Sequence, residues 1–196
     1  MDTTRAKTRD IARNAVRSEL AQVAFRLFHR ESFEKVTFDD LAAAAGVSRS
    51  TFLRYFGSKE EVVLSGFDPL GDQMADALRT RPADEDSWTS LRRAVDPAIK
   101  YFDKNPADTL ALLRLVQNTP ALVARLREKQ LGWRPALAEV LVERSASEGM
   151  SPLAAHVRVA AAMECVTVAL EQWVDVDTRV ALDTLTDDAF AALTSA

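Results

Sequence analysis

Residues 37–61 constrain the fold of this chain most, because they hold two short helical segments that meet at a glycine. Thr37 can cap the first segment, and Asp40, three residues on, can complete a capping box. Gly46 stands where a helix ends best in a left-handed backbone state, which costs a residue with a Cβ roughly 1 kcal/mol. Ser48 can then cap a second helix. The spacing predicts a helix-turn-helix.

The second helix of this pair has an apolar and a polar face. Phe52 and Phe56 are four residues apart, so both should point inward. The residues left outside carry donors that suit phosphates and base edges, and they are Arg49, Ser50, Thr51, Arg54 and Tyr55. Because short helix pairs with a glycine turn also occur as plain structural corners, the motif alone is only moderately specific.

The segment that follows carries another helix start. Gly57 should end the second helix, and Ser58 with Glu61 can form a further capping box. Lys59 lies in the first turn, where the helix dipole disfavours a cation unless an anion is near. A DNA phosphate would supply that anion, so we expect Lys59 to contact phosphate.

A long amphipathic helix, then TFDDLAAAAGVS, then TFLRYFGSKEE resembles the N-terminal DNA-binding domain of the TetR family of repressors. The detailed resemblance covers residues 9–63, and YFGSKEE is its most specific part. It implies an all-α fold with a three-helix helix-turn-helix DNA-binding domain at 1–63 and a helical ligand-binding and dimerisation domain at 64–196. The DNA-binding residues predicted are Thr37, Ser48, Arg49, Ser50, Thr51, Leu53, Arg54, Tyr55 and Lys59.

Two positions depart from the family pattern. Ser32 stands where the family usually has glycine, just past the first long helix. Leu53 stands where it usually has tyrosine or phenylalanine, so this side chain can make only apolar contact, for example with a thymine methyl. Packing of Leu53 against the first helix is an equal alternative.

Charge is divided unevenly along the 196 residues. Residues 1–63 carry 11 basic and 9 acidic side chains, net +2, whereas residues 64–196 carry 14 and 20, net −6. A small basic face can bind a polyanion while the acidic remainder discourages indiscriminate adhesion. The acidic balance of the whole chain therefore does not argue against DNA.

Several features favour a cytoplasmic protein with no membrane partner. Cys165 is the only cysteine, so no intramolecular disulfide can form. The N-terminus is charged and lacks the apolar core of a signal peptide. The most apolar stretch, 157–174, is interrupted by Arg158, Glu164 and Glu171, which is expensive in a membrane and ordinary in a buried helix.

Capping residues and prolines predict where helices begin in the rest of the chain. A first helix is expected over residues 9–31, preceded by residues 2–8 as a mobile basic arm that reaches DNA or as a solvated tail. Capping residues precede the prolines expected to open helices, which are Pro69, Pro106, Pro120 and Pro152. Kinks or short breaks are expected at Pro97 and Pro135, and a loop at 81–87.

The last two predicted helices, 152–174 and 178–193, suggest a homodimer. The first of them is apolar nearly all round, more than one chain's core would cover, and its small residues permit close helix approach. TetR-like proteins use their last two long helices for dimerisation, and the resemblance implies the same here. Burial within one chain is the alternative.

The sequence offers little for catalysis. His29 and His156 have no companions at metal-ligand or catalytic-triad spacing, and there is no phosphate-cradling glycine loop or dinucleotide fingerprint. We predict no enzymatic activity, no cofactor and no metal.

The resemblance also implies a small effector bound among the C-terminal helices. A hydrophobic or amphiphilic molecule fits, and TFLRYFGSKEE looks like a subset of regulators that take acyl-CoA-like ligands. The predicted lining residues are Phe67, Met74, Phe102, Leu112, Leu115, Val116, Asn118, Trp133, Met163 and Thr167. Such a set at helical spacing also fits a plain core.

These observations favour a transcriptional regulator, most simply a repressor that a small hydrophobic effector releases from a palindromic double-stranded DNA operator. Two alternatives stay open. One is a constitutive DNA-binding dimer without an effector, and the other is an all-α enzyme or carrier with an incidental helix-turn-helix.

Overall fold

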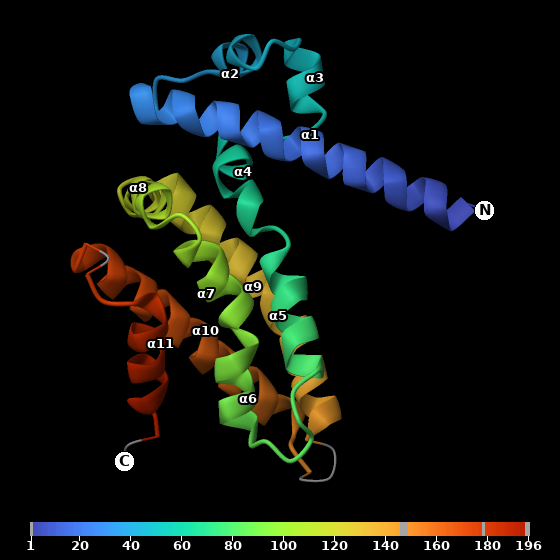
Figure 1. The fold of residues 1–196 in the computed structure, drawn as a ribbon, viewed down its shortest axis with the longest axis vertical. Helices are drawn as coiled ribbons and strands as arrows, with labels where there is room; N and C mark the ends of the chain where they lie inside the picture. The colour runs from blue at the N-terminus through green and yellow to red at the C-terminus, as the bar shows by residue number, and fades with distance from the viewer. Residues whose placement is uncertain (1, 146–148, 178, 195–196) are drawn as a thin grey trace. The chain divides into compact units, whose positions relative to one another are not determined.

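The computed structural model describes residues 2–145, 149–177 and 179–194, with backbone only for 2–11 and His29. Every regular element in these ranges is helical (Figure 1). The helices form two compact units, Met1–Asp68 and Pro69–Ala196. The units therefore divide five residues after the boundary that we expected from the sequence.

The first unit contains four α-helices and a 3₁₀ turn. These are α1 (Asp2–Arg30), α2 (Phe38–Ala44), α3 (Arg49–Leu53), α4 (Lys59–Leu64) and η1 (Ser65–Phe67). Residues 2–8 belong to α1, so the mobile arm expected there is wrong. Ala24, Leu41, Phe52 and Phe56 lie in the core, which brings α1, α2 and α3 together.

The local signals around the helix pair behave as the sequence predicted. Thr37 and Asp40 form the full capping box, and Gly46 has φ +66°, in the left-handed region. The hydroxyl of Ser48 accepts a hydrogen bond from the Thr51 amide at 3.1 Å. Two turns of backbone thus receive their hydrogen-bond partners from adjacent side chains.

Two details of this segment differ from expectation. Ser58 caps α4 as predicted, but the Glu61 carboxylate accepts from the Gly57 amide at 2.8 Å and does not close the box on Ser58. The helix α3 ends at Leu53, yet a hydrogen-bonded turn from the Phe52 carbonyl carries the chain on and keeps Phe56 buried.

The second unit is a bundle of seven helices within the described residues. They are α5 (Leu70–Arg79), α6 (Ser87–Ala94), α7 (Asp96–Asp103), α8 (Pro106–Gln117), α9 (Pro120–Arg144), α10 (Pro152–Asp175) and α11 (Leu182–Ala191). The long helix α9 packs against both α5 and α10, and α10 packs against α11 (Figure 1). Met74, Leu141 and Trp173 are fully buried between these helices.

The prolines mark most helix starts. Pro106, Pro120 and Pro152 open α8, α9 and α10 as predicted, while Pro69 stands one residue before α5. A short break at Val95 separates α6 from α7, close to Pro97. The helix α9 continues through Pro135, so this proline does not break the helix. The last helix begins at Leu182, later than expected, and the predicted start at residue 178 lies outside the described residues.

Among the helices of the described ranges, α10 has the length and composition needed to cross a membrane. Its contacts explain part of this composition, because α10 packs against both α9 and α11. Ala155, Val159, Ala162 and Trp173 face that interior. The sequence interpretation of this stretch as a core helix is consistent with these contacts.

One buried arginine ties α6 to α11. The Arg92 side chain is 7% exposed, and its guanidinium donates to the carboxylates of Asp96 at 2.7 Å, Asp187 at 2.5 Å and Asp183. Burial lowers the pKa of Arg92, but hydrogen bonds to these three carboxylates more than offset it and the pKa is raised. Three partners compensate the desolvation of one charge, which a single partner does poorly.

Close approach of α5 and α9 depends on a glycine. The Trp133 ring of α9 lies directly over Gly71 of α5, so a Cβ at position 71 would stand 2.7 Å from the Trp133 Cγ. Real Cβ atoms do not approach this closely, so the Trp133 ring would have to shift. Trp133 therefore acts as the packing element of the α5–α9 contact.

Gly71→Ala should lower the free energy of unfolding by about 1–3 kcal/mol, because the added methyl overpacks the Trp133 contact. Gly132→Ala is the matched control, since a Cβ there meets nothing within 4 Å and a helical alanine should stabilise by about 1 kcal/mol. Urea denaturation of both variants measures the difference. Equal stability of the two alanine variants would contradict the proposed clash.

Candidate nucleic-acid interface

The start of α3 gathers three hydroxyl groups at the surface. The Ser48 Oγ lies 3.0 Å from the Ser50 Oγ and donates to the Thr51 Oγ1 at 2.9 Å. Ser48 and Ser50 are exposed and Thr51 is half-buried. The structure thus brings these three predicted DNA-binding residues together at one helix end.

Thr37 is the N-cap of α2, and its hydroxyl and amide already have a hydrogen-bond partner. Its hydroxyl donates to the Asp40 Oδ2 at 2.6 Å and its amide donates to the same oxygen at 2.8 Å. These hydrogen bonds, the side-chain one first, hold the pKa of Asp40 below its usual value. Because Asp40 stays a carboxylate, Thr37 can bind a phosphate only by exchanging one acceptor for another.

Arg49 has a carboxylate partner in the helix-turn-helix itself. Its Nη1 donates to the Asp39 Oδ2 at 2.7 Å, and the two side chains are 57% and 66% exposed. Solvent-exposed pairs of this kind contribute only about 0.2–1 kcal/mol. A phosphate close to α3 can compete with such a weak pair.

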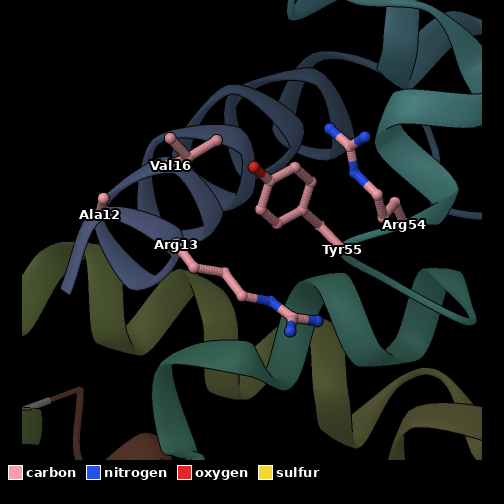
Figure 2. A pocket seen from close by; sticks show the side chains of 5 residues that line it. All are labelled: Ala12, Arg13, Val16, Arg54 and Tyr55. Carbon is pink, nitrogen blue, oxygen red and sulfur yellow. The ribbon is translucent and has the colours of Figure 1, made fainter. Parts of the chain in front are cut away.

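The end of α3 faces an open hollow against α1. Ala12, Arg13 and Val16 line it from α1, and Arg54 and Tyr55 line it from the other side. Figure 2 shows the Tyr55 ring pointing toward α1, with Arg13 and Arg54 on either side of it. The Arg54 guanidinium carbon lies 5.7 Å from the centre of the Tyr55 ring, within cation–π range.

The structure adds two features to this surface. Arg13 of α1 joins the predicted residues, although it was not among them. Leu53 is 41% exposed and does not lie in the core. An apolar side chain at that position is available to a thymine methyl, so the alternative of burial against α1 is not favoured.

Lys59 has partners that the sequence did not suggest. Its Nζ donates to the carbonyls of Phe33 and Val36, both at 2.9 Å, and lies 4.7 Å from the centre of the Phe33 ring. The premise that only an anion favours a cation at this helix start is therefore wrong. A direct phosphate contact stays a prediction. Two of the three ammonium N–H groups donate to the carbonyls, so one N–H group is left for a phosphate.

The ten residues predicted to line an effector site differ in burial and in the elements that carry them. Phe67 belongs to η1 of the first unit; Met74, Phe102, Val116 and Met163 are core residues. Leu112, Leu115, Trp133 and Thr167 are half-buried, and Asn118 is exposed. A second open hollow lies at Ser87, Trp88, Val157 and Leu193, and none of the ten lines it or the hollow at Tyr55.

Contacts of Trp133 and Thr167 explain this result. Trp133 fills the space over Gly71, and the Thr167 hydroxyl donates to the Met163 carbonyl at 3.0 Å and accepts from Gln130 at 3.4 Å. Side chains that pack a helical core have the same spacing as side chains that line a cavity. Periodicity alone could not distinguish the two.

Within the described residues no three His, Cys, Asp or Glu side chains are grouped so that they could hold a metal ion. Three acidic groups near the interface, Asp40, Glu61 and Asp39, are engaged by Thr37, Arg17 and Arg49. The chemistry of this surface is therefore that of donors and cations.

Comparison with known proteins identifies the family. A family model described as "Bacterial regulatory proteins, tetR family" matches residues 20–65, and one described as "MftR C-terminal domain" matches residues 85–196, more than half of the chain. The chain belongs to the TetR family of bacterial regulatory proteins. The first TetR match covers all of the predicted DNA-binding residues.

Two curated relatives carry regulator names. The chain is 31% identical to the HTH-type transcriptional regulator TcmR of Streptomyces glaucescens over 65% of this chain and 59% of TcmR. It is 34% identical to the HTH-type transcriptional regulator EthR of Mycolicibacterium smegmatis over 66% of this chain and 62% of EthR. The matched segments thus span less than two thirds of these TetR-family relatives. Their names are those of regulators and not of enzymes, which argues against the enzyme or carrier alternative.

Solved structures share the fold. FadR from Bacillus subtilis in complex with stearoyl-CoA has a TM-score of 0.61 and 17% identity, and the match covers 90% of this chain and 96% of FadR. The SmeT–triclosan complex has a TM-score of 0.62 and 16% identity, with 91% of each chain covered. At this identity the likeness concerns the TetR-type fold alone.

Proposed function

We propose that this TetR-family protein binds double-stranded DNA through α2 and α3 and represses transcription in the cytoplasm. The observation that carries the proposal is the exposed donor surface of α3. A left-handed Gly46 and two side-chain caps hold this helix against α2, so its hydroxyl and guanidinium groups face solvent. The regulator names of the relatives support the same function.

Each part of the surface has a different role in this proposal. Thr37, Ser48, Ser50 and Thr51 offer hydroxyl groups that fix register by contacts to phosphate and sugar. Arg49 and Arg54 have the planar donors that recognise guanine in the major groove. Leu53 and Tyr55 contribute apolar and phenolic contacts beside them.

Arg54→Ala should weaken binding to the preferred site by roughly 1–3 kcal/mol and relax its sequence specificity. Arg93→Ala is the charge-matched control, because Arg93 is exposed on α6 in the second unit. The measurement is a gel shift at several salt concentrations with a duplex that the parent protein selects from a random-sequence pool. If Arg54→Ala binds like Arg93→Ala, the assignment of α3 is wrong; if the parent selects no duplex, DNA binding itself is refuted.

We further propose a two-fold dimer through α10 and α11. The support is an uncovered apolar surface, where Leu153 and Val157 of α10 are 76% and 60% exposed and Leu193, just after α11, is 59% exposed. A surface helix of one chain does not normally present such side chains together. A two-fold dimer would present two α3 helices to half-sites about 34–36 Å apart or somewhat more, so the operator should be nearly palindromic.

Ala161→Arg should convert the dimer into a monomer, because an unpaired charge at a close helix interface costs several kcal/mol. Ala161 is half-buried on α10 beside Val157 in the second hollow. Ala124→Arg is the control, since Ala124 is exposed on α9. Light scattering at micromolar concentration should give a dimer for the parent and the control. A monomeric parent would remove the dimer from this proposal.

We also propose that a hydrophobic or amphiphilic molecule, for which an acyl-CoA is a suitable model, binds in the second unit and releases DNA. The support is the fold shared with proteins bound to stearoyl-CoA and triclosan. Flexible Met74 and Met163, both buried in the second unit, are suited to move aside for such a ligand. Hundredfold release requires about 2.7 kcal/mol of preference for the non-binding arrangement.

A screen of acyl-CoA esters, fatty acids and planar hydrophobic compounds should find one that raises Tm by about 5–10 °C at saturating concentration. The same compound should displace the protein from the selected duplex. A stabiliser that leaves DNA binding unchanged would contradict effector-driven release. If no compound stabilises the protein, a constitutive DNA-binding dimer becomes the better account.

A further inference from the structure

We infer that Lys59 is a positioning residue, whose ammonium clamps the turn between α1 and α2 and so fixes the reading helices. The inference rests on the proposed DNA binding. It assigns Lys59 a role different from the direct phosphate contact predicted from the sequence. The two roles make different predictions for charge-conserving variants.

The clamp is a short-range contact between distant parts of the sequence. Lys59 is the first residue of α4, and its two acceptors, the carbonyls of Phe33 and Val36, lie 26 and 23 residues earlier. Both acceptor residues are buried, Phe33 at 5% and Val36 at 0% exposure. The Phe33 ring also lies beneath the ammonium. A cation placed in this way satisfies two carbonyls of an irregular segment that helix hydrogen bonding does not reach.

The clamped turn leads directly into the reading helices. Val36 precedes Thr37, the N-cap of α2, and the next residue, Phe38, packs edge-on against Phe52 of α3 with ring centroids 6.0 Å apart. On the other side Phe33 packs against Phe28 of α1, with centroids 5.1 Å apart. The position of the turn therefore determines where α2 begins on α1, and through Phe38 and Phe52 it determines how α3 is held.

The geometry suits lysine in particular. An ammonium is a compact point charge with three rotatable donors, so it can serve two carbonyls and a ring face at once. A guanidinium has the same charge but presents its donors in a rigid planar fork. Arginine at position 59 would therefore keep the charge and lose the geometry.

Three variants test the clamp on the full-length chain. Lys59→Met keeps the apolar stem and removes the donors, and Lys59→Arg keeps the charge. Lys35→Met is the control, because it removes a cation from the same turn without touching the clamp, and Lys35 is exposed. Without DNA, both Lys59 variants should lower Tm and accelerate amide exchange at Lys35 and Val36, whose amides donate to the Ser32 carbonyl. Lys35→Met should leave Tm and the Val36 amide unchanged.

DNA binding separates positioning from phosphate contact. With the duplex selected by the parent protein, both Lys59 variants should bind at least about tenfold more weakly, while the dependence of affinity on salt stays that of the parent. A phosphate contact predicts instead that Lys59→Arg binds like the parent and that Lys59→Met flattens the salt slope by about 0.9 for each lysine lost. That result would overturn the inference.

The exchange measurement keeps the two proposals distinguishable. Unchanged protection of Lys35 and Val36 in Lys59→Met would show that no clamp exists, whatever the DNA result. If the parent protein selects no duplex, DNA binding is refuted and the positioning role falls with it, while accelerated exchange would still report the clamp.

Discussion

The guanidinium of Arg17 joins α1 to α4 and to the end of η1. It donates to the Glu61 carboxylate at 2.8 Å and to that of Asp68, and it lies 5.1 Å from the centre of the Phe56 ring. Glu61 in turn accepts from the Gly57 amide. One cation therefore connects the supporting helix, the turn after α3 and the start of α4. If Arg17 were removed, the carboxylates of Glu61 and Asp68 would be left without a compensating charge. Removing one partner of such an ion pair is therefore costly.

The Lys59 contact repeats this arrangement from the first residue of α4. Arg17 holds the turn after α3, and Lys59 holds the turn before α2, so both irregular segments that flank the helix-turn-helix are tied by cations. Loops held by side-chain contacts to a rigid element keep their geometry better than loops that rely on their own backbone. The surface of α3 is accordingly presented by a frame whose turns are already fixed in the protein alone.

The sequence was sufficient for the parts of this fold that depend on neighbours in the chain. Thr37 with Asp40, Gly46 and Ser48 act over three or four residues, and each was found in its predicted place. It was insufficient where partners are far apart, as for Lys59 with Phe33 or Trp133 with Gly71.

Two other sequence patterns were ambiguous. The first residues of α1 lack an apolar stripe, so periodicity did not extend the helix back to Asp2. Core packing and cavity lining have the same helical spacing, so the effector residues were chosen from a pattern that fits either. The structure separates these cases only through contacts such as that of Trp133 with Gly71.

The exposed pair of Arg49 and Asp39 has a consequence for the entropy of recognition. A free arginine side chain loses up to about 2 kcal/mol of rotamer freedom when it is immobilised. Asp39 already restricts the Arg49 side chain in the protein alone, so part of this rotamer entropy is lost when the protein folds. That part is not lost again if a phosphate or a base replaces the carboxylate as the partner of Arg49. In the proposed complex with DNA, the carboxylate of Asp39 would lie beside the polyanion without its arginine partner. It would therefore oppose any complex that does not give Arg49 an equally good contact.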